Sequence, residues 1–341
     1  MSNDHGRLAL AATERAADPG GLDDDTLRTA YTHMVRSRLL DERIWLLNRL
    51  GRARFWVSAM GHEALQVGLG MALRPGHDWV APYYRDLALS LVVGMTPRDH
   101  LLAALARADD PNCGSRQMPA HYSSRRLQII STGSCVATQL PHAAGVALAS
   151  KMRGEDAVTV TTVGDGGTSE GDFHEALNFA AIHTLPLVCV VENNGLAISV
   201  PLRKQMPPVD IAEKARAYGI PGVTVDGGDV VASLLVCREA VERARRGEGP
   251  TLIDGRVQRL ADHSSDDDQK RYRSSADIDA DKRSDCLIRE RATLEESGVL
   301  RPGDAEEIRA AVMRELDRAL DEAEAAPMAA ADTAHRHVYG E

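Results

Sequence analysis

Two apolar runs that each end in a turn of small residues constrain the fold of this chain most strongly. The first run, at 157–163, leads into a Gly-Asp-Gly-Gly turn at 164–167, and the second, at 185–191, leads into an Asn-Asn-Gly turn at 193–195. Between them, residues 172–183 have apolar positions at helical spacing. This order predicts two parallel strands joined by a right-handed crossover through a helix, with both turns at one edge of the sheet.

The alternation of strand and helix patterns extends on both sides of this unit. Such alternation is typical of helices packed on both faces of a parallel sheet. We therefore expect an α/β fold, namely a three-layer, doubly wound, mainly parallel sheet with helical N- and C-terminal extensions. The further strands are predicted at 222–225 and 251–259, and the further helices at 25–49, 61–73, 86–93, 96–108, 138–152, 211–218, 230–246, 281–297 and 302–326.

The pattern also divides the chain into three parts. Residues 1–25 are polar and are predicted to form a flexible N-terminal segment, residues 26–275 form the α/β domain, and residues 276–341 form a C-terminal helical extension. The α/β domain includes a polar loop at 260–275. Loops of this length inside a compact domain are usually functional or disordered.

Composition excludes several classes of function. A formal net charge of −10 and an isoelectric point near 5.7 argue against binding to nucleic acid or to a membrane surface. The apolar stretches fall short of the ~20 residues that span a bilayer. The first 25 residues are acidic and lack an apolar core, unlike a transit peptide or a secretory signal. Because the five cysteines are also scattered without metal-ligand or redox spacing, we expect a cytoplasmic protein with reduced thiols.

The two turns together can hold an anion and a metal ion. The backbone amides of Gly166 and Gly167 can donate to a closely approaching anion. Asp165 offers a charged oxygen and Asn194 a neutral one, and Mg²⁺ takes one or two protein oxygens with the remainder from phosphates and water. The spacing matches neither a dinucleotide fingerprint nor a Walker loop. The first turn alone is equally consistent with an ordinary strand-to-helix turn, but its pairing with the second favours a metal–diphosphate site.

The residues around these turns resemble a known family. The Gly-Asp-Gly turn at 164–166 and Asn193-Asn194, separated by 26 residues, resemble the thiamine-diphosphate motif of thiamine-dependent enzymes. The stretches 170–181 and 192–199 resemble the alpha subunit of the heterotetrameric 2-oxo acid dehydrogenase first component. The resemblance covers residues 26 to about 325, and it implies the thiamine-diphosphate-binding fold with thiamine diphosphate and Mg²⁺ as cofactors.

This resemblance assigns cofactor contacts. It implies that Asp165, Asn194 and the backbone carbonyl of Leu196 bind the metal. An arginine in the Tyr84-Arg85 pair suits a phosphate because it pairs with it bidentately, although the pair taken alone is more typical of a solvated surface. The implied cofactor-binding residues are Tyr84, Arg85, Ser134, Val136, Asp165, Gly166, Gly167, Glu192, Asn194 and His263. In some relatives the same region holds a structural K⁺ ion, for which Gly133, Cys135, Thr138 and Gln139 stand at the corresponding positions.

The polar loop resembles the active-site loop of the family, whose histidine reaches the cofactor. The resemblance therefore implies that His263 is catalytic, and an imidazole is suited to proton transfer near neutral pH. Mitochondrial relatives are phosphorylated on serines of this loop, and Ser264 and Ser274 stand at similar places. A phosphate beside His263 would add negative charge near a diphosphate, so we expect it to inhibit.

The segment 114–122 and the loop at 263–273 resemble those of branched-chain relatives more than those of pyruvate enzymes. The resemblance implies a small 2-oxo acid with a branched tail as substrate. Its pocket would be lined by Phe55, Trp56, Tyr84, His121 and Ser134. Because one methylene discriminates by only ~1–3 kcal/mol, alpha subunits of pyruvate and acetoin dehydrogenases remain alternatives.

The implied reaction is the oxidative decarboxylation of a 2-oxo acid followed by reductive acylation of a lipoyl group. In two-chain members of the family, the glutamate that touches the cofactor's aminopyrimidine ring lies on the beta subunit. We therefore expect an α₂β₂ assembly with a beta subunit, acting on a lipoyl acyltransferase, and no activity from this chain alone. A single-chain transketolase-like enzyme is disfavoured because a pyrimidine-binding half is absent. A non-catalytic paralogue that binds thiamine diphosphate remains an alternative.

Overall fold

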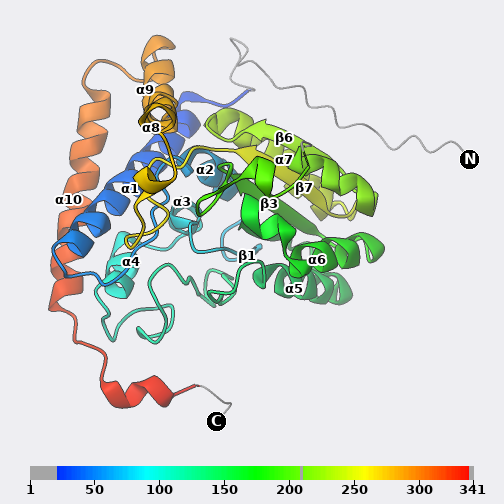
Figure 1. The fold of residues 1–341 in the computed structure, drawn as a ribbon, viewed down its shortest axis with the longest axis horizontal. Helices are drawn as coiled ribbons and strands as arrows, with labels where there is room; N and C mark the ends of the chain where they lie inside the picture. The colour runs from blue at the N-terminus through cyan, green and yellow to red at the C-terminus, as the bar shows by residue number, and fades with distance from the viewer. Residues whose placement is uncertain (1–20, 208–209, 338–341) are drawn as a thin grey trace, which may run out of the picture.

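A computed structural model describes residues 21–207 and 210–337 and centres on one five-stranded parallel sheet (Figure 1). The strand order is β1(Trp79–Ala81), β2(Thr159–Gly164), β3(Leu187–Asn193), β7(Thr251–Arg256) and β6(Gly222–Asp226). The predicted mainly parallel α/β fold is confirmed. β2 and β3 are direct neighbours, with Gly164 opposite Glu192, so the two turns emerge side by side as their crossover predicts.

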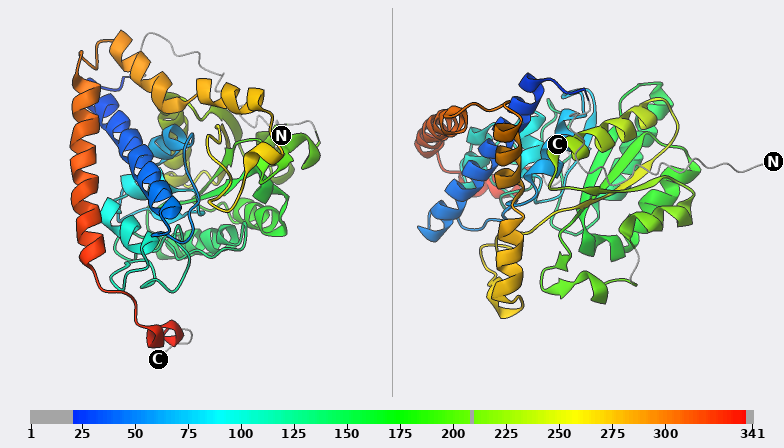
Figure 2. Two further views of the ribbon diagram at one scale, coloured as in Figure 1. Left: turned by 60° about the vertical axis from the view of Figure 1, so that its left-hand side comes forward. Right: turned by 90° about the horizontal axis from the view of Figure 1, so that it is seen from above.

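Helices cover both faces of this sheet (Figures 1 and 2). α5(Gln139–Arg153) and α6(Gly171–Ile182) pack on one face, and α2(Glu63–Met71) and α7(Val230–Arg245) lie on the other. The side chains of β3 alternate between two hydrophobic clusters: Val188 and Val190 join the α2 side, whereas Cys189 and Val191 join the α5 side. This alternation follows from the two-residue period of a strand.

The N- and C-terminal helices form a second layer against α2. α1(Asp24–Arg49) begins after Asp23, whose carboxylate caps the first turn, and it packs beside α10(Asp304–Ala325) in both views of Figure 2. α3(Leu87–Val92) and α4(Pro97–Ala104) complete this layer, and the capping box at Thr96 and Asp99 starts α4.

The prediction of a single helix at 281–297 is wrong. The structure has α8(Ser275–Arg283) and α9(Cys286–Glu296), separated at Asp285. The Asp285 carboxylate accepts a hydrogen bond from the Leu287 amide and pairs with the buried Arg38 guanidinium at 2.8 Å. A side chain that caps the next helix and binds a distant arginine interrupts the helical pattern.

Short elements that the sequence pattern does not predict surround the ends of the strands. β1 has only three residues, and β4(Leu196–Ala197) and β5(Val200–Pro201) form a small antiparallel hairpin after β3. Asp165–Ser169 and the predicted helix at Ile211–Tyr218 are 3₁₀ helices, as are Leu202–Lys204, Gln269–Arg271 and Ala331–His335. The hairpin folds back over the Gly-Asp-Gly-Gly turn, which places it at the functional site.

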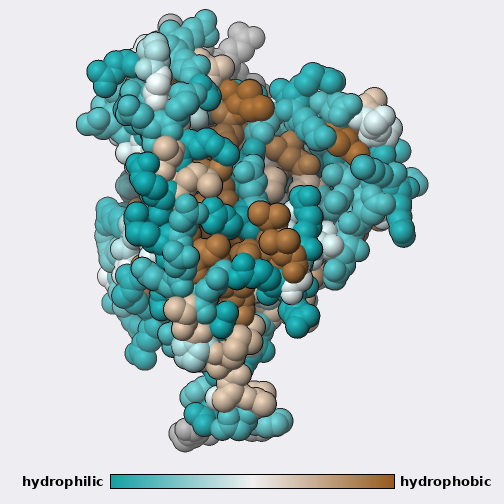
Figure 3. Space-filling model, turned by 90° about the vertical axis from the view of Figure 1, so that its left-hand side faces the viewer, coloured by the Kyte–Doolittle hydropathy of each residue, from teal (hydrophilic) through white to brown (hydrophobic). Residues whose placement is uncertain are grey.

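Residues 1–20, which make up most of the predicted flexible segment 1–25, lie outside the described part of the chain. Among the described residues, no helix combines the length and apolarity of a membrane span. The face seen in Figure 3 is largely hydrophilic, with hydrophobic residues gathered near its middle.

Candidate functional site

The carboxyl ends of β2 and β3 border a cavity of about 390 Å³. Its walls come from five separate parts of the chain, which the fold brings to one edge of the sheet. The sequence-predicted residues that line it are Tyr84, Arg85, Gly133, Ser134, Cys135, Val136, Gln139, Asp165, Gly166, Gly167, Asn194, Leu196 and His263. This position is where open α/β sheets bind ligands.

The Gly-Asp-Gly-Gly turn forms the floor of this cavity as a 3₁₀ helix. A Cβ atom at Gly166 would lie 2.7 Å from the Cβ of Ala197, and one at Gly167 would lie 3.1 Å from the Val136 Cγ1. The Lys214 ammonium donates to the carbonyl of Thr168 at 2.7 Å and holds the end of the turn. The backbone of this turn therefore packs closely against its neighbours and lines the cavity.

Asp165 places a carboxylate at the start of the turn. The residue is 1% exposed, and the Gln205 side chain donates to its Oδ2 at 2.8 Å. Burial raises the pKa of Asp165, while the hydrogen bond from Gln205 opposes that shift. A cation in the cavity would favour the charged form, so this carboxylate is suited to bind one.

Asn194 faces the same cavity from the turn after β3. Its Oδ1 accepts a hydrogen bond from the Leu196 amide at 3.2 Å, and its Nδ2 lies 3.4 Å from the His62 Nε2. Asp165 and Asn194 supply one charged and one neutral oxygen, the donor set that suits Mg²⁺ together with phosphate. Among the described residues, no three His, Cys, Asp or Glu side chains cluster as a further metal site.

Arg85 provides the positive charge of the cavity. It is 2% exposed, and its Nη1 donates to the carbonyl oxygen of Ser58. Its Nη2 lies 3.3 Å from the Nδ1 of His263, and its guanidinium lies 5.5 Å from the ring centre of Tyr84. Burial alone would lower the pKa of Arg85, but the nearby tyrosines and Glu192 outweigh burial and raise it. Arg85 therefore remains a cation that can bind an anion.

His263 lies beside Arg85 on the 260–275 loop. Burial lowers the pKa of His263 to about 4, and the positive charges of Arg85 and Arg259 act in the same direction. The loop is held in place because Asp267 accepts a hydrogen bond from the His263 amide at 2.9 Å and one from the Tyr272 hydroxyl. At neutral pH the imidazole is uncharged, and because the Arg85 guanidinium can only donate, Nδ1 accepts from it and Nε2 carries the ring proton.

The 133–139 segment forms another wall of the cavity. Ser134 hydrogen bonds to the Nε2 of His121 at 2.6 Å, which brings these two predicted substrate residues together. Val136 is 48% exposed on the cavity side. The hydroxyl of Thr138 donates to the carbonyl of Cys135 at 3.0 Å, and the amide of Gln139 donates to the carbonyl of Thr162 at 2.7 Å.

Five predicted site residues lie outside the cavity lining, namely Phe55, Trp56, His121, Thr138 and Glu192. The Trp56 indole donates to Asp41 at 2.8 Å within the core, and Phe55 is half-buried beside it in the chain. The Trp56 backbone pairs with Ser265, so this segment supports the loop that carries His263. Glu192 is buried behind the cavity wall, where it binds His62 instead of facing the cavity.

Other residues at the site were not singled out from the sequence. They are His62, which contacts Asn194, Gln205, which contacts Asp165, and the cavity-lining Tyr83, Glu170 and Ile198. Isolated histidines and glutamines carry no motif. The two-residue period of β3 could have predicted the direction of Glu192. Val190 lies on the α2 face of the sheet, and Glu192, two residues later, points to the same face.

Comparisons with known proteins agree with this architecture. Residues 31–332 match the family model of the dehydrogenase E1 component. The chain is 45% identical to the 2-oxoisovalerate dehydrogenase subunit alpha of Bacillus subtilis, over 94% of this chain and 97% of the relative. It is 41% identical to the 3-methyl-2-oxobutanoate dehydrogenase subunit alpha of Mycobacterium tuberculosis (82% and 73%), and 38% identical to the pyruvate dehydrogenase E1 component subunit alpha of Staphylococcus aureus (89% and 79%). The chain belongs to the dehydrogenase E1 component family, whose members depend on thiamine diphosphate.

Proposed function

We propose that this chain is the alpha subunit of a branched-chain 2-oxo acid dehydrogenase. The enzyme would decarboxylate the 2-oxo acid and transfer the acyl group to the lipoyl group of an acyltransferase. The observation that carries the proposal is the cavity in which Asp165, Asn194, Arg85 and His263 meet at the ends of two adjacent strands. The branched-chain names of the relatives with 45% and 41% identity support this substrate class over pyruvate.

The residues of the cavity fit thiamine diphosphate and Mg²⁺. Asp165 and Asn194, with the backbone carbonyl of Leu196, would hold the metal, and the backbone amides of Gly166 and Gly167, which line the cavity, would donate to the diphosphate. The buried Asp165 carboxylate would gain a counter-charge from the cation. The K⁺ site implied for the 133–139 segment stays a prediction.

Each residue would perform a distinct task in the reaction. When bound, thiamine diphosphate supplies the carbanion chemistry that no side chain provides. Arg85 binds the diphosphate, because its guanidinium is buried and charged. His263, neutral beside Arg85, carries its ring proton at Nε2 and can donate it to the reacting substrate and take it back there. Tyr84, Ser134 and Val136 shape the wall next to the reacting atoms.

The substrate would lie at the open side of the cavity. Ser134 lines the cavity and hydrogen bonds to His121 just outside the lining, and this pair can bind the carboxylate or oxo oxygen of a 2-oxo acid. Phe55 and Trp56 would contribute through the packing of the 260–275 loop, because the Trp56 backbone is tied to Ser265.

A beta subunit would complete the site. The apolar side chains Val136 and Ile198 line the cavity yet are 48% and 54% exposed. Such residues suit the cover of a second chain, which would supply the glutamate for the aminopyrimidine ring in an α₂β₂ assembly. The cytoplasmic location that we expect from the acidic composition stays a prediction.

Co-expression of this chain with its beta subunit tests the proposal. A dye-linked assay with 2-oxoisovalerate, pyruvate and acetoin should show the highest kcat/KM for 2-oxoisovalerate, and activity should require thiamine diphosphate and Mg²⁺. The chain alone should be inactive. Full activity without the beta subunit, or a preference for pyruvate or acetoin, would contradict the proposal.

A further inference from the structure

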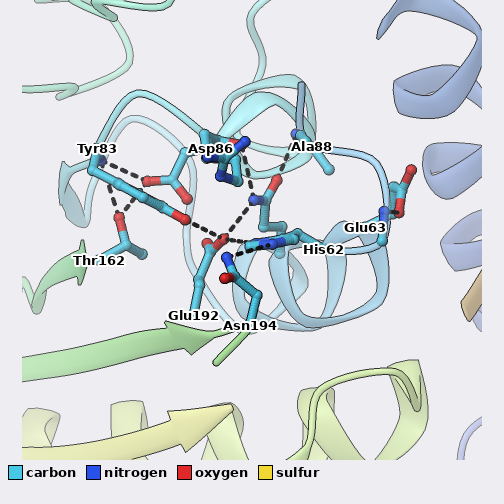
Figure 4. A network of polar contacts seen from close by, with 12 residues as sticks. His62, Glu63, Tyr83, Asp86, Ala88, Thr162, Glu192 and Asn194 are labelled. Carbon is cyan, nitrogen blue, oxygen red and sulfur yellow. Dashed lines mark hydrogen bonds and ion pairs between the residues drawn. The ribbon is translucent and has the colours of Figure 1, made fainter. Parts of the chain in front are cut away.

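A chain of buried polar side chains runs from the core to Asn194 (Figure 4). The Nδ1 of His62 lies 2.6 Å from the Oε2 of Glu192, and the Nε2 of His62 lies 3.4 Å from the Nδ2 of Asn194. His62 and Glu192 are 0% and 1% exposed, so contacts within the protein, and not water, must satisfy their polar atoms. Figure 4 shows the side chain of Glu192 pointing from the end of β3 toward His62, with Asn194 next to it and also in contact with the imidazole.

The position of Glu192 is fixed by several further contacts. Its Oε2 also accepts hydrogen bonds from the side-chain amide of Gln66 at 2.9 Å and from the hydroxyl of Tyr83 at 3.0 Å. The orientation of the Gln66 amide is itself set, because its Oε1 accepts from the Ala88 backbone and its Nε2 donates to the carbonyl of Arg85. Glu192 is therefore a fixed acceptor that faces His62.

These contacts determine which atom of Asn194 faces His62. The amide of Leu196 donates to the Oδ1 of Asn194 at 3.2 Å, so the Nδ2 must be the atom that faces His62. Because Nδ2 can only donate, the Nε2 of His62 must accept, and its Nδ1 must carry the proton that it donates to Glu192. One arrangement of protons satisfies all three side chains.

We propose that Glu192 and His62 are positioning residues that fix the side-chain amide of Asn194 with its Oδ1 turned toward the metal. A flipped amide would present its NH₂ group to the cation, which cannot bind it. The second lone pair of Oδ1 stays available because the Leu196 amide occupies only one. The inference rests on the proposed function, since it takes Asn194 to be a metal ligand. In this proposal Glu192 does not contact the metal or the cofactor and acts only by holding His62 in place.

Two substitutions at His62 separate orientation from packing. His62→Leu removes the acceptor for Asn194 and the donor to Glu192. His62→Gln places an oxygen that can accept from the Asn194 Nδ2 near the position of Nε2. His33→Leu is the matched control, because His33 is a partly buried histidine of α1 whose ring contacts Arg36 at 3.2 Å, outside the cavity lining.

The readout is metal affinity, measured on the full chain co-purified with its beta subunit. Mn²⁺ binding in the presence of thiamine diphosphate is followed by electron paramagnetic resonance, and cofactor binding in EDTA is measured separately by calorimetry. Changes to groups that orient metal ligands typically weaken metal affinity about 10–100-fold. We expect a loss of this size for His62→Leu, most of it recovered in His62→Gln. We expect no change for His33→Leu and little change in metal-free cofactor binding for any variant.

Three results would overturn the inference. Mn²⁺ affinity of a folded His62→Leu variant within twofold of the wild type would show that His62 does not orient Asn194. Equal losses in His62→Leu and His62→Gln would show that only packing at this position matters. Absence of Mn²⁺ and thiamine diphosphate binding by the wild type would refute the proposed function, and the inference with it.

Discussion

Replacement of Gly166 by alanine tests whether close packing of the glycine turn holds the two metal-binding loops together. The added Cβ would lie 2.7 Å from the Cβ of Ala197 in β4. Carbon atoms pack at about 3.5–4.0 Å, so the overlap is at least ~0.8 Å. The side chain of alanine has no rotamer to change, so only the backbone of the turn or of the hairpin can move. Overpacking of this kind costs about 1–3 kcal/mol.

The assay compares the free energy of unfolding of Gly166→Ala with that of Gly145→Ala. A Cβ at Gly145 in α5 meets nothing within 4 Å, and replacement of a mid-helix glycine by alanine stabilises by about 0.5–1 kcal/mol. In urea, we expect Gly166→Ala to unfold at a lower midpoint than the wild type and Gly145→Ala at a higher one, with unchanged slopes.

The same substitution should also weaken metal binding, because the displacement separates Asp165 in the turn from Asn194 before the hairpin. The reasoning is refuted if Gly166→Ala is as stable as the wild type, or if it is destabilised by 1–3 kcal/mol yet binds Mn²⁺ and thiamine diphosphate normally.

Four further outcomes are expected. Gln205→Leu removes the hydrogen bond to Asp165 and should weaken Mn²⁺ affinity about 10–100-fold in the resonance assay. It should leave metal-free cofactor binding unchanged. Arg85→Gln should raise the Kd for thiamine diphosphate about tenfold or more by calorimetry, since hydrogen bonds to charged groups contribute about 1.5–3 kcal/mol. The pKa of His263 is about 4 in the folded chain and near 6.5 when unfolded. The unfolded chain therefore takes up a proton first as the pH falls from 6.5 to 4, and the folded state loses stability over that range. In urea titrations between pH 5 and 7, the free energy of unfolding of His263→Gln should fall less with decreasing pH than that of the wild type. An identical pH dependence in the two proteins would contradict the lowered pKa of His263. Ser264→Glu should lower the activity of the assembled enzyme, and unchanged activity would count against control by charge in this loop.

The sequence pattern predicts the centre of the fold because its signals are local. Apolar runs at 157–163 and 185–191 predict β2 and β3, and a single crossover between parallel strands leaves few ways to pair them. The capping residues Thr96 and Asp229 mark helix starts for the same reason, since a cap bonds amides two or three residues away. β1 is too short to leave a periodic signal.

The break at Asp285 shows where local reasoning fails. The pattern at 281–297 is helical throughout, but the Asp285 carboxylate caps α9 and also pairs with Arg38, 247 residues away in the chain. A contact between residues so far apart in the chain overrides local helix propensity. It cannot be detected from the residues near position 285 alone.

The sequence by itself determined that two turns, one with Asp165 and one with Asn194, lie side by side at the end of a parallel sheet. Strand period and crossover handedness are properties of the backbone, so they can be deduced from residue order. Only the tertiary structure decided what surrounds these turns. His62 and Asn194 are 132 residues apart, and Arg85 and His263 are 178 apart. Their contacts arise because α2 packs on the face of the sheet to which Glu192 points, and because the 260–275 loop folds back over Arg85. Side-chain direction and loop path depend on the packing of the whole core, which residue order alone does not specify.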